Sequence, residues 1–219
     1  MSRDLRVQQS SLSAFGESTV SGGIATRLGA QVVVDFYTYM ALSGAVYQVR
    51  AGTITTPLVG DVVITDAAAE MCADCVSGTT IIPVGLGIAI RLQGGTLNEF
   101  AAKSTITTST AGVAFVPLPL KSNGSAAVST ARVTAAGGVA VRTEVATETL
   151  RHWEYANPVA AGAGNDPTGV AIASNAWNPK CPPVLVGPRC FYVQIAATGT
   201  GPSYFAHFDY IEAPTATIL

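Results

Sequence analysis

The last long stretch of the chain, residues 189–212, constrains the fold most strongly. Two aromatic, β-prone runs flank a loop that is rich in glycine and proline, which is the pattern of a β-hairpin. Because side chains alternate along a strand, each run has one largely apolar face. These faces hold Phe191, Val193 and Ile195 in the first run and Tyr204, Ala206, Phe208 and Tyr210 in the second. We therefore expect this hairpin to be the central pair of a sheet, with the rest of the chain built around it.

Short β-prone segments separated by turn residues recur along the rest of the chain. The predicted strands are residues 24–34, 36–39, 45–49, 53–56, 59–65, 79–93, 105–108, 113–120, 127–134, 139–147 and 150–155. Two of them, 127–134 and 139–147, flank Gly137 and Gly138 and are predicted to pair as a second hairpin.

Two connections are predicted to be short helices. Residues 66–75 are rich in alanine and begin at Asp66, which is placed as an N-cap. Residues 97–103 follow Thr96 and contain Glu99, the spacing of a capping box. Together the elements predict an all-β protein, an antiparallel β-sandwich of jelly-roll type with one or two short helices in its connections.

The chain divides into an extended N-terminal arm, residues 1–23, and a single β-domain, residues 24–219, with a long irregular insertion at 157–188. The arm is polar and rich in serine, and such a segment buries too little apolar surface to fold alone. We expect it to lie over an adjacent subunit. Its apolar anchors are Leu5, Val7, Leu12, Phe15 and Val20.

Charge is scarce for a protein of this size. Hydrophobic residues make up 48% of the 219 residues and charged residues only 12%, against about 25% in ordinary soluble domains. One explanation is an all-β chain rich in Thr, Ser, Ala and Gly; the other is that much of the surface lies against other subunits, since interface cores are depleted of charge. The net charge of −2 and the lack of a long basic run argue against direct nucleic-acid binding. No signal peptide and no membrane-spanning helix is predicted.

The four cysteines leave several alternatives open. Cys72 and Cys75 have the spacing of half a zinc site, but Cys181 and Cys190 are too far apart to form the second half of a standard one. Buried thiols are the simplest interpretation. A disulfide between Cys181 and Cys190 is a further alternative.

No motif predicts catalysis, a cofactor or a resident metal. His207 and Asp209 lie on one face of a predicted strand, where a structural imidazole is the simpler interpretation because no nucleophile elbow accompanies them. The glycine-rich loop 198–202 lacks the lysine and the helix of a phosphate loop.

A loose acidic cluster comprises Asp61, Asp66, Glu70 and Asp74. Its spacing is not that of an EF-hand, which leaves weak calcium binding or a solvated polar face as the two interpretations. Asn123 lies in a glycosylation sequon, but a turn explains this sequence without a sugar. We expect no enzyme.

Three aromatic residues near the insertion are candidates for an interface or a ligand site: Trp153, Tyr155 and Trp177. Such rings commonly anchor packing or subunit contacts. Stacked together in an open groove they would instead bind carbohydrate.

Several stretches resemble a known family when taken with the polar arm and the low charge. These stretches are residues 78–84, 94–99, 114–120 and 204–212. They resemble the single jelly-roll coat proteins of icosahedral viruses, including tailless phages, in style over nearly the whole chain and without a diagnostic motif. The resemblance implies a coat subunit that is made in the host cytoplasm, resides in the virion and contacts copies of itself and other virion proteins. Since a strongly basic arm is missing, it implies a shell around an internal membrane or an inner shell. A cement (decoration) protein and a carbohydrate-binding fibre head share this style.

Overall fold

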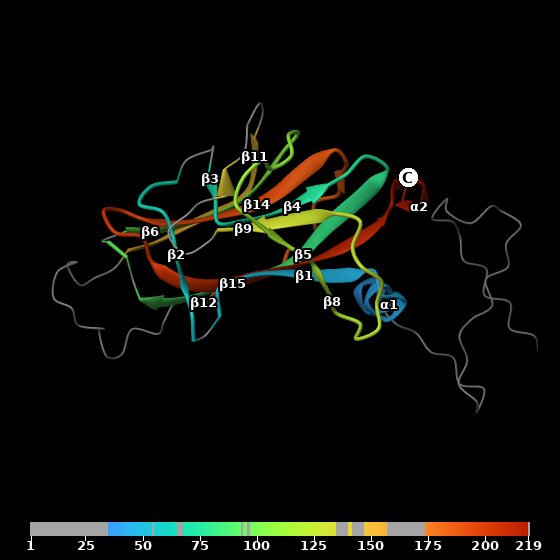
Figure 1. Ribbon diagram of the computed structural model, residues 1–219, viewed down its shortest axis with the longest axis horizontal. Helices are drawn as coiled ribbons and strands as arrows, with labels where there is room; N and C mark the ends of the chain where they lie inside the picture. Colours follow the sequence, from blue (N-terminus) through green and yellow to red (C-terminus); the bar gives the residue numbers. More distant parts are fainter. Residues whose placement is uncertain are drawn as a thin grey trace, which may run out of the picture.

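Two antiparallel β-sheets face each other in the computed structural model of the chain (Figure 1). The structure describes residues 35–53, 55–64, 68–92, 94–95, 97–134, 140–141, 147–156 and 174–218. The predicted all-β sandwich is confirmed. The described residues include two short helices, α1 (Phe36–Ser43) and α2 (Thr215–Ile218). The predicted strand 24–34 and the N-terminal arm lie outside the described residues, and no helix among the described residues is long and apolar enough to cross a membrane.

The first sheet has seven strands. Its main path runs β12 (Ser174–Trp177), β5 (Thr79–Leu92), β15 (Ser203–Pro214), β1 (Val46–Ala51) and β8 (Leu118–Pro119). Two short strands join it from the side, β13 (Leu185–Val186) on β5 and β2 (Leu58–Val59) on β15.

The second sheet has six strands, in the order β11 (Thr147–Ala156), β6 (Leu97–Thr105), β14 (Arg189–Ala197), β4 (Met71–Cys75), β9 (Thr130–Val133) and β7 (Val113–Phe115). A separate two-stranded ladder joins β3 (Ala68–Ala69) to β10 (Ala140–Val141).

Four strand pairs are nested along the sequence. β1 pairs with β15, β4 with β14, β5 with β12 and β6 with β11, all antiparallel. The first strand therefore meets the last, and each later strand meets one that comes correspondingly earlier from the other end. Successive pairs fall alternately in the seven-stranded and the six-stranded sheet. Among the described residues, these four pairs are thus nested along the sequence and divided between the two layers.

The predicted hairpin of residues 189–212 is wrong in one respect. β14 and β15 are both central, as expected, but each is central to a different sheet. The expected apolar faces of the two strands are correct, and they meet each other across the core. A hairpin would have placed both faces on the same side of one sheet. Crossing between the layers lets each strand bury its aromatic face against the other, which removes more apolar surface from water.

The glycines of the crossing loop permit close approach of backbone to backbone. A Cβ on Gly201 would lie 1.8 Å from the carbonyl oxygen of Gly60, and one on Gly95 would lie 1.5 Å from that of Thr198. Any larger residue would push these segments apart. This close packing explains the glycine at position 201 of the loop 198–202.

Three secondary-structure predictions are wrong because tertiary packing or capping decided the outcome. The predicted helices 66–75 and 97–103 are strands β3, β4 and β6. All five residues of β4 are buried, and the small Ala, Cys and Ser side chains suit strands covered on both faces. The predicted strand 36–39 is helix α1, because Asp35 accepts a hydrogen bond from the Thr38 amide at 3.0 Å and Gly44 ends the helix in the left-handed conformation at φ 83°.

Other strand predictions are correct in part. The predicted strands 45–49, 79–93 and 150–155 correspond to β1, β5 and β11. Residues 113–120 divide into β7 and β8, which belong to different sheets. The predicted hairpin of 127–134 with 139–147 is wrong, since β9 pairs with β4 and β7 while β10 pairs with β3. Within the insertion, residues 174–177 and 185–186 form β12 and β13, and 157–173 lie outside the described residues.

Candidate functional site

The two tryptophans pack against the core from opposite sheets. Trp153 on β11 stacks on Phe100, with ring centroids 5.7 Å apart, and Trp177 on β12 stacks on Phe191 at 6.2 Å. Both rings are partly buried against the same core cluster. The side chain of Tyr155 lies outside the described residues, as do the arm anchors Leu5, Val7, Leu12, Phe15 and Val20. The tryptophan rings therefore act in packing, and the carbohydrate hypothesis gains nothing from them.

His207 and Asp209 share the outer face of the seven-stranded sheet but have separate partners. The imidazole of His207 lies over Gly87, where a Cβ would come within 2.6 Å of its Cε1 atom. The Asp209 carboxylate accepts a hydrogen bond from the Gln48 side-chain amide at 2.8 Å, and Gln48 in turn accepts one from the Arg50 side chain. His207 and Asp209 are therefore part of a row of polar side chains on the sheet surface, in which His207 covers Gly87 and Asp209 binds Gln48.

The two cysteines of the Cys72–Cys75 pair lie on opposite faces of β4. Cys75 packs in the main core and donates hydrogen bonds to the carbonyls of Thr79 and Leu185, while burial raises its pKa to about 11. Cys72 packs with Cys190 and Tyr192 on the outer face of the six-stranded sheet, where a hydrogen bond with the Cys190 thiol lowers its pKa. The half zinc site is therefore wrong. The Cys181–Cys190 disulfide is wrong as well, because Cys190 is buried, Cys181 is exposed and no disulfide joins them.

Of the predicted acidic cluster, the structure brings only Asp61 and Glu70 together, at 3.3 Å between the Asp61 amide and the Glu70 carboxylate, and it places Asp74 elsewhere. Asp66 lies outside the described residues, and Glu70 and Asp74 are both buried and serve different loops. Asp74 accepts hydrogen bonds from the amide of Ser109 at 2.8 Å and from its hydroxyl. A third buried carboxylate, Glu212, accepts the amides of Val128 and Ser129 at 2.7 and 2.8 Å. These carboxylates hold loops by their backbone N–H groups, which is a structural task.

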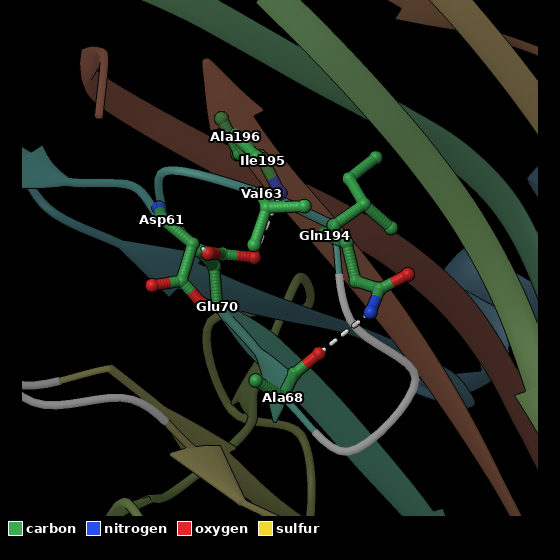
Figure 2. Close-up of a pocket in the computed structure, with 8 residues that line it drawn as sticks. Asp61, Val63, Ala68, Glu70, Gln194, Ile195 and Ala196 are labelled. Carbon is green, nitrogen blue, oxygen red and sulfur yellow. Dashed lines mark hydrogen bonds between the residues drawn. The ribbon is translucent and has the colours of Figure 1, made fainter. Parts of the chain in front are cut away.

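Glu70 joins two segments that pair in turn with the same edge of β14. Its backbone amide donates to the carbonyl of Val193, and its carboxylate accepts the Ile195 amide at 2.7 Å and the Asp61 amide at 3.3 Å. Further along β14, the Asp61 amide donates a hydrogen bond to the Ile195 carbonyl, and the Asp61 carbonyl accepts one from the Ala197 amide. The side chain thus replaces a missing rung of the ladder (Figure 2). Burial raises the pKa of Glu70 to about 8, against the lowering effect of the Ile195 hydrogen bond.

The hollow beside Glu70 has no room for a water molecule between its lining side chains. The Gln194 side chain closes one side by donating a hydrogen bond to the Ala68 carbonyl at 2.7 Å (Figure 2). The hollow lies where β4 and the Asp61 segment meet along the edge of β14.

The outer face of β6 and β11 carries a group of side chains that we did not predict from the sequence. Glu99, His152 and Glu154 bring their ligand atoms within 4.8 Å of one another. The sequence signal was weak: His152 and Glu154 are two residues apart on one predicted strand, and Glu99 was assigned to a helix. Only the strand register brings Glu99 opposite Glu154.

Large apolar side chains are exposed at the end of the sandwich where α1 lies beside β8 (Figure 1). Four of them are on the helix: Phe36, Tyr37, Tyr39 and Leu42. Two more, Leu118 and Leu120, are on β8 and directly after it. We call these six residues the apolar end.

Comparison with protein-family models, with curated proteins and with solved structures finds no match to this chain.

Proposed function

We propose that this protein is a non-enzymatic structural subunit that assembles with copies of itself, and specifically a coat subunit of a virion. The observation that carries the proposal is the apolar end. An exposed surface of this kind on a chain with few charges is typical of a protein–protein contact.

Helix α1 has aromatic and aliphatic side chains that face away from its own domain. Phe36 is 54% exposed, Tyr39 48% and Leu42 64%, while only Met40 and Ala41 pack onto the small cluster of Val46, Ile82 and Ile211. The helix contains no charged residue. Leaving such side chains in water costs free energy that a partner surface would recover.

The occupant we propose for the apolar end is a second copy of the chain. A net charge of −2 gives copies little electrostatic repulsion at close approach. The patch also continues along the 116–120 segment, which the Leu120 amide ties to the Val46 carbonyl at 3.0 Å. The 116–120 segment is therefore held at the end of β1 that directly follows the helix. Repeated in every copy, one such contact can close a shell by symmetry.

The nested strand pairing supports the virion interpretation. Four nested antiparallel pairs divided between two sheets support a jelly-roll interpretation of the sandwich, and jelly rolls occur in viral capsid proteins, lectins and cupins. Fold alone does not give function. In this chain the space between the sheets is filled by apolar side chains, and Trp153 and Trp177 belong to that packing. Among the functions of capsid protein, lectin and cupin, the exposed apolar end favours that of a capsid protein, which assembles with its own copies.

The experiment compares assembly of the full chain with that of a helix variant, Phe36→Gln/Tyr39→Gln/Leu42→Gln, by mass photometry over a range of concentrations. Glutamine keeps helix propensity while removing apolar area. The matched control, Val62→Gln/Leu92→Gln, removes apolar side chains that are 52% and 60% exposed away from α1. We expect large assemblies for the unsubstituted chain and the control, and monomers for the helix variant with unchanged circular dichroism. A monomeric unsubstituted chain at high concentration would contradict the proposal. A cement protein would bind preformed shells without forming its own.

A further inference from the structure

The three side chains of Glu99, His152 and Glu154 converge on the outer face of the six-stranded sheet at its β11 edge. Their ligand atoms lie within 4.8 Å of one another, and the Nε2 atom of His152 is 3.9 Å from Oε1 of Glu154. Within the part of the chain that the structure describes, this is the one such group of three metal-ligating residues. It is separate from the apolar end and from the buried carboxylates.

Strand register builds the group. His152 and Glu154 alternate onto the same face of β11, and Glu154 lies directly opposite Glu99 on β6. His152 lies opposite Ala101, whose methyl group leaves room for the imidazole ring to turn toward both carboxylates. The three groups therefore come from two strands held in fixed register over most of the length of β6.

The backbone behind the group is rigid. Trp153, between His152 and Glu154, stacks on Phe100, the neighbour of Glu99, with centroids 5.7 Å apart and ring planes at 21°. The Phe100 side chain is fully buried. This stack fixes the spacing of the two strands at the level of the site, which is the kind of support that a preorganised metal site needs.

The arrangement is unfavourable without a cation. Like charges directly opposite on antiparallel strands destabilise the pair, and Glu99 and Glu154 are such a pair. A divalent ion between the carboxylates would neutralise both at once.

We propose that Glu99, His152 and Glu154 bind one divalent transition-metal ion, with Zn²⁺ as the probe. One imidazole nitrogen with two carboxylate oxygens suits Zn²⁺ and its neighbours in the first transition row, and a fourth position stays open to water or to a ligand from another molecule. Ligand atoms about 2.1 Å from one ion lie about 3.4–4.2 Å apart. The side chains of His152 and Glu154 are 46% and 51% exposed, so they are free to rotate by the small amount that closure requires. The bound ion would clip the edge strand β11 to β6.

The experiment measures Zn²⁺ affinity by competition with a chromophoric chelator, on full-length protein that has been stripped with EDTA. All variants carry Cys181→Ser, because Cys181 is the exposed thiol and a competing ligand. We expect one Zn²⁺ per chain, with binding weakened at least tenfold in His152→Ala and in Glu154→Gln. The matched control is His207→Ala, which removes the other histidine, also exposed, and leaves binding unchanged.

A second readout is the thermal midpoint, which we expect Zn²⁺ to raise in the Cys181→Ser background and in His207→Ala but not in His152→Ala. Absence of stoichiometric binding would overturn the inference. So would equal affinity in His152→Ala, or a loss confined to His207→Ala. Because none of these residues belongs to the apolar end, each result leaves the assembly proposal to its own test.

Discussion

The rings of Phe191 and Phe208 meet edge to face across the core, with centroids 5.0 Å apart and planes at 76°. Phe191 comes from the centre of the six-stranded sheet and Phe208 from the centre of the seven-stranded sheet. Both are fully buried. This contact joins the two layers at their middle strands.

Truncating either ring should therefore destabilise the whole domain. We expect Phe191→Ala and Phe208→Ala each to lower the free energy of unfolding by about 3–5 kcal/mol. In a double-mutant cycle the pair should show a coupling of about 0.5–1.5 kcal/mol from the edge-to-face contact. Urea unfolding followed by circular dichroism measures both quantities. Leu92→Ala, at a side chain that is 60% exposed, is the control and should stay within about 0.5 kcal/mol of the unsubstituted chain. Additive losses at Phe191 and Phe208 would contradict direct coupling.

The same two residues show how far the sequence leads. Period-two alternation correctly assigns Phe191 and Phe208 to inward faces, because alternation depends only on the local backbone. It does not say which sheet a strand joins, since the five-residue loop 198–202 can close a hairpin or cross between layers. The choice depends on packing between distant segments such as Gly60 and Gly201. Local propensity misassigned β4 and β6 for the same reason: both are strands because of pairing with distant segments, and β4 is in addition buried on both faces.

The candidate metal group lay beyond sequence reasoning for a related reason. His152 and Glu154 are close along the chain, but Glu99 joins them only through the pairing of β6 with β11. The two strands are separated in the sequence by the long connection between Thr105 and Thr147, so their register cannot be deduced from local sequence. The helical part of the apolar end, in contrast, is visible in the sequence as the run Phe36–Leu42. The aromatic residues of this run favour a strand until Asp35 and Gly44 are recognised as helix caps.

Glu70 should make the stability of the domain fall as pH rises toward 8. Its pKa is raised from 4.5 to about 8 on folding, so between those values the folded state binds more protons than the unfolded state. Linkage then gives a stabilising contribution that is complete below pH 4.5 and is lost as pH rises through 8. We expect the unsubstituted chain to lose on the order of a few kcal/mol relative to Glu70→Gln across this window.

Urea midpoints of the two proteins at half-unit pH intervals measure the difference. Asp61 and Tyr204 also interact electrostatically with Glu70. Both residues are present in the two proteins, so their own contributions to stability cancel in the comparison. Parallel curves from pH 5 to 8 would mean that Glu70 is ionised throughout. Glu70→Ala should be less stable than Glu70→Gln at every pH, because it leaves the buried Ile195 amide without its partner.

Glu212 should hold the segment before β9 in place. Its carboxylate accepts the amides of Val128 and Ser129, and Glu212→Ala would leave two N–H donors without a protein acceptor. We expect a loss of about 2–3 kcal/mol together with faster hydrogen exchange at these two amides. The comparison variant is Glu154→Ala in metal-free buffer, which removes a carboxylate that is half exposed and should cost little. Unchanged exchange at Val128 and Ser129 in Glu212→Ala would refute this role.

Deleting residues 1–23 should separate assembly from folding. The arm lies outside the described residues, and its apolar anchors are few and widely spaced along a polar segment. Ordering each backbone residue costs roughly 1–2 kcal/mol, which so few anchors cannot offset on their own domain. Contact with a neighbouring copy would bury both sides of the arm and supply backbone partners. We therefore expect the truncated chain to keep its thermal midpoint within a few degrees while its yield of assemblies drops several-fold.

The two readouts must be taken on the same preparations, because a destabilised subunit also assembles poorly. The helix variant at Phe36, Tyr39 and Leu42 provides the reference for assembly lost with the fold retained. A full-length variant with Leu5, Leu12 and Phe15 changed to serine keeps the chain length and removes only the anchors, so it should match the truncation if apolar contact is the cause. If truncation instead lowers the thermal midpoint strongly while the yield per folded subunit stays constant, the arm belongs to the fold of its own domain and takes no part in assembly.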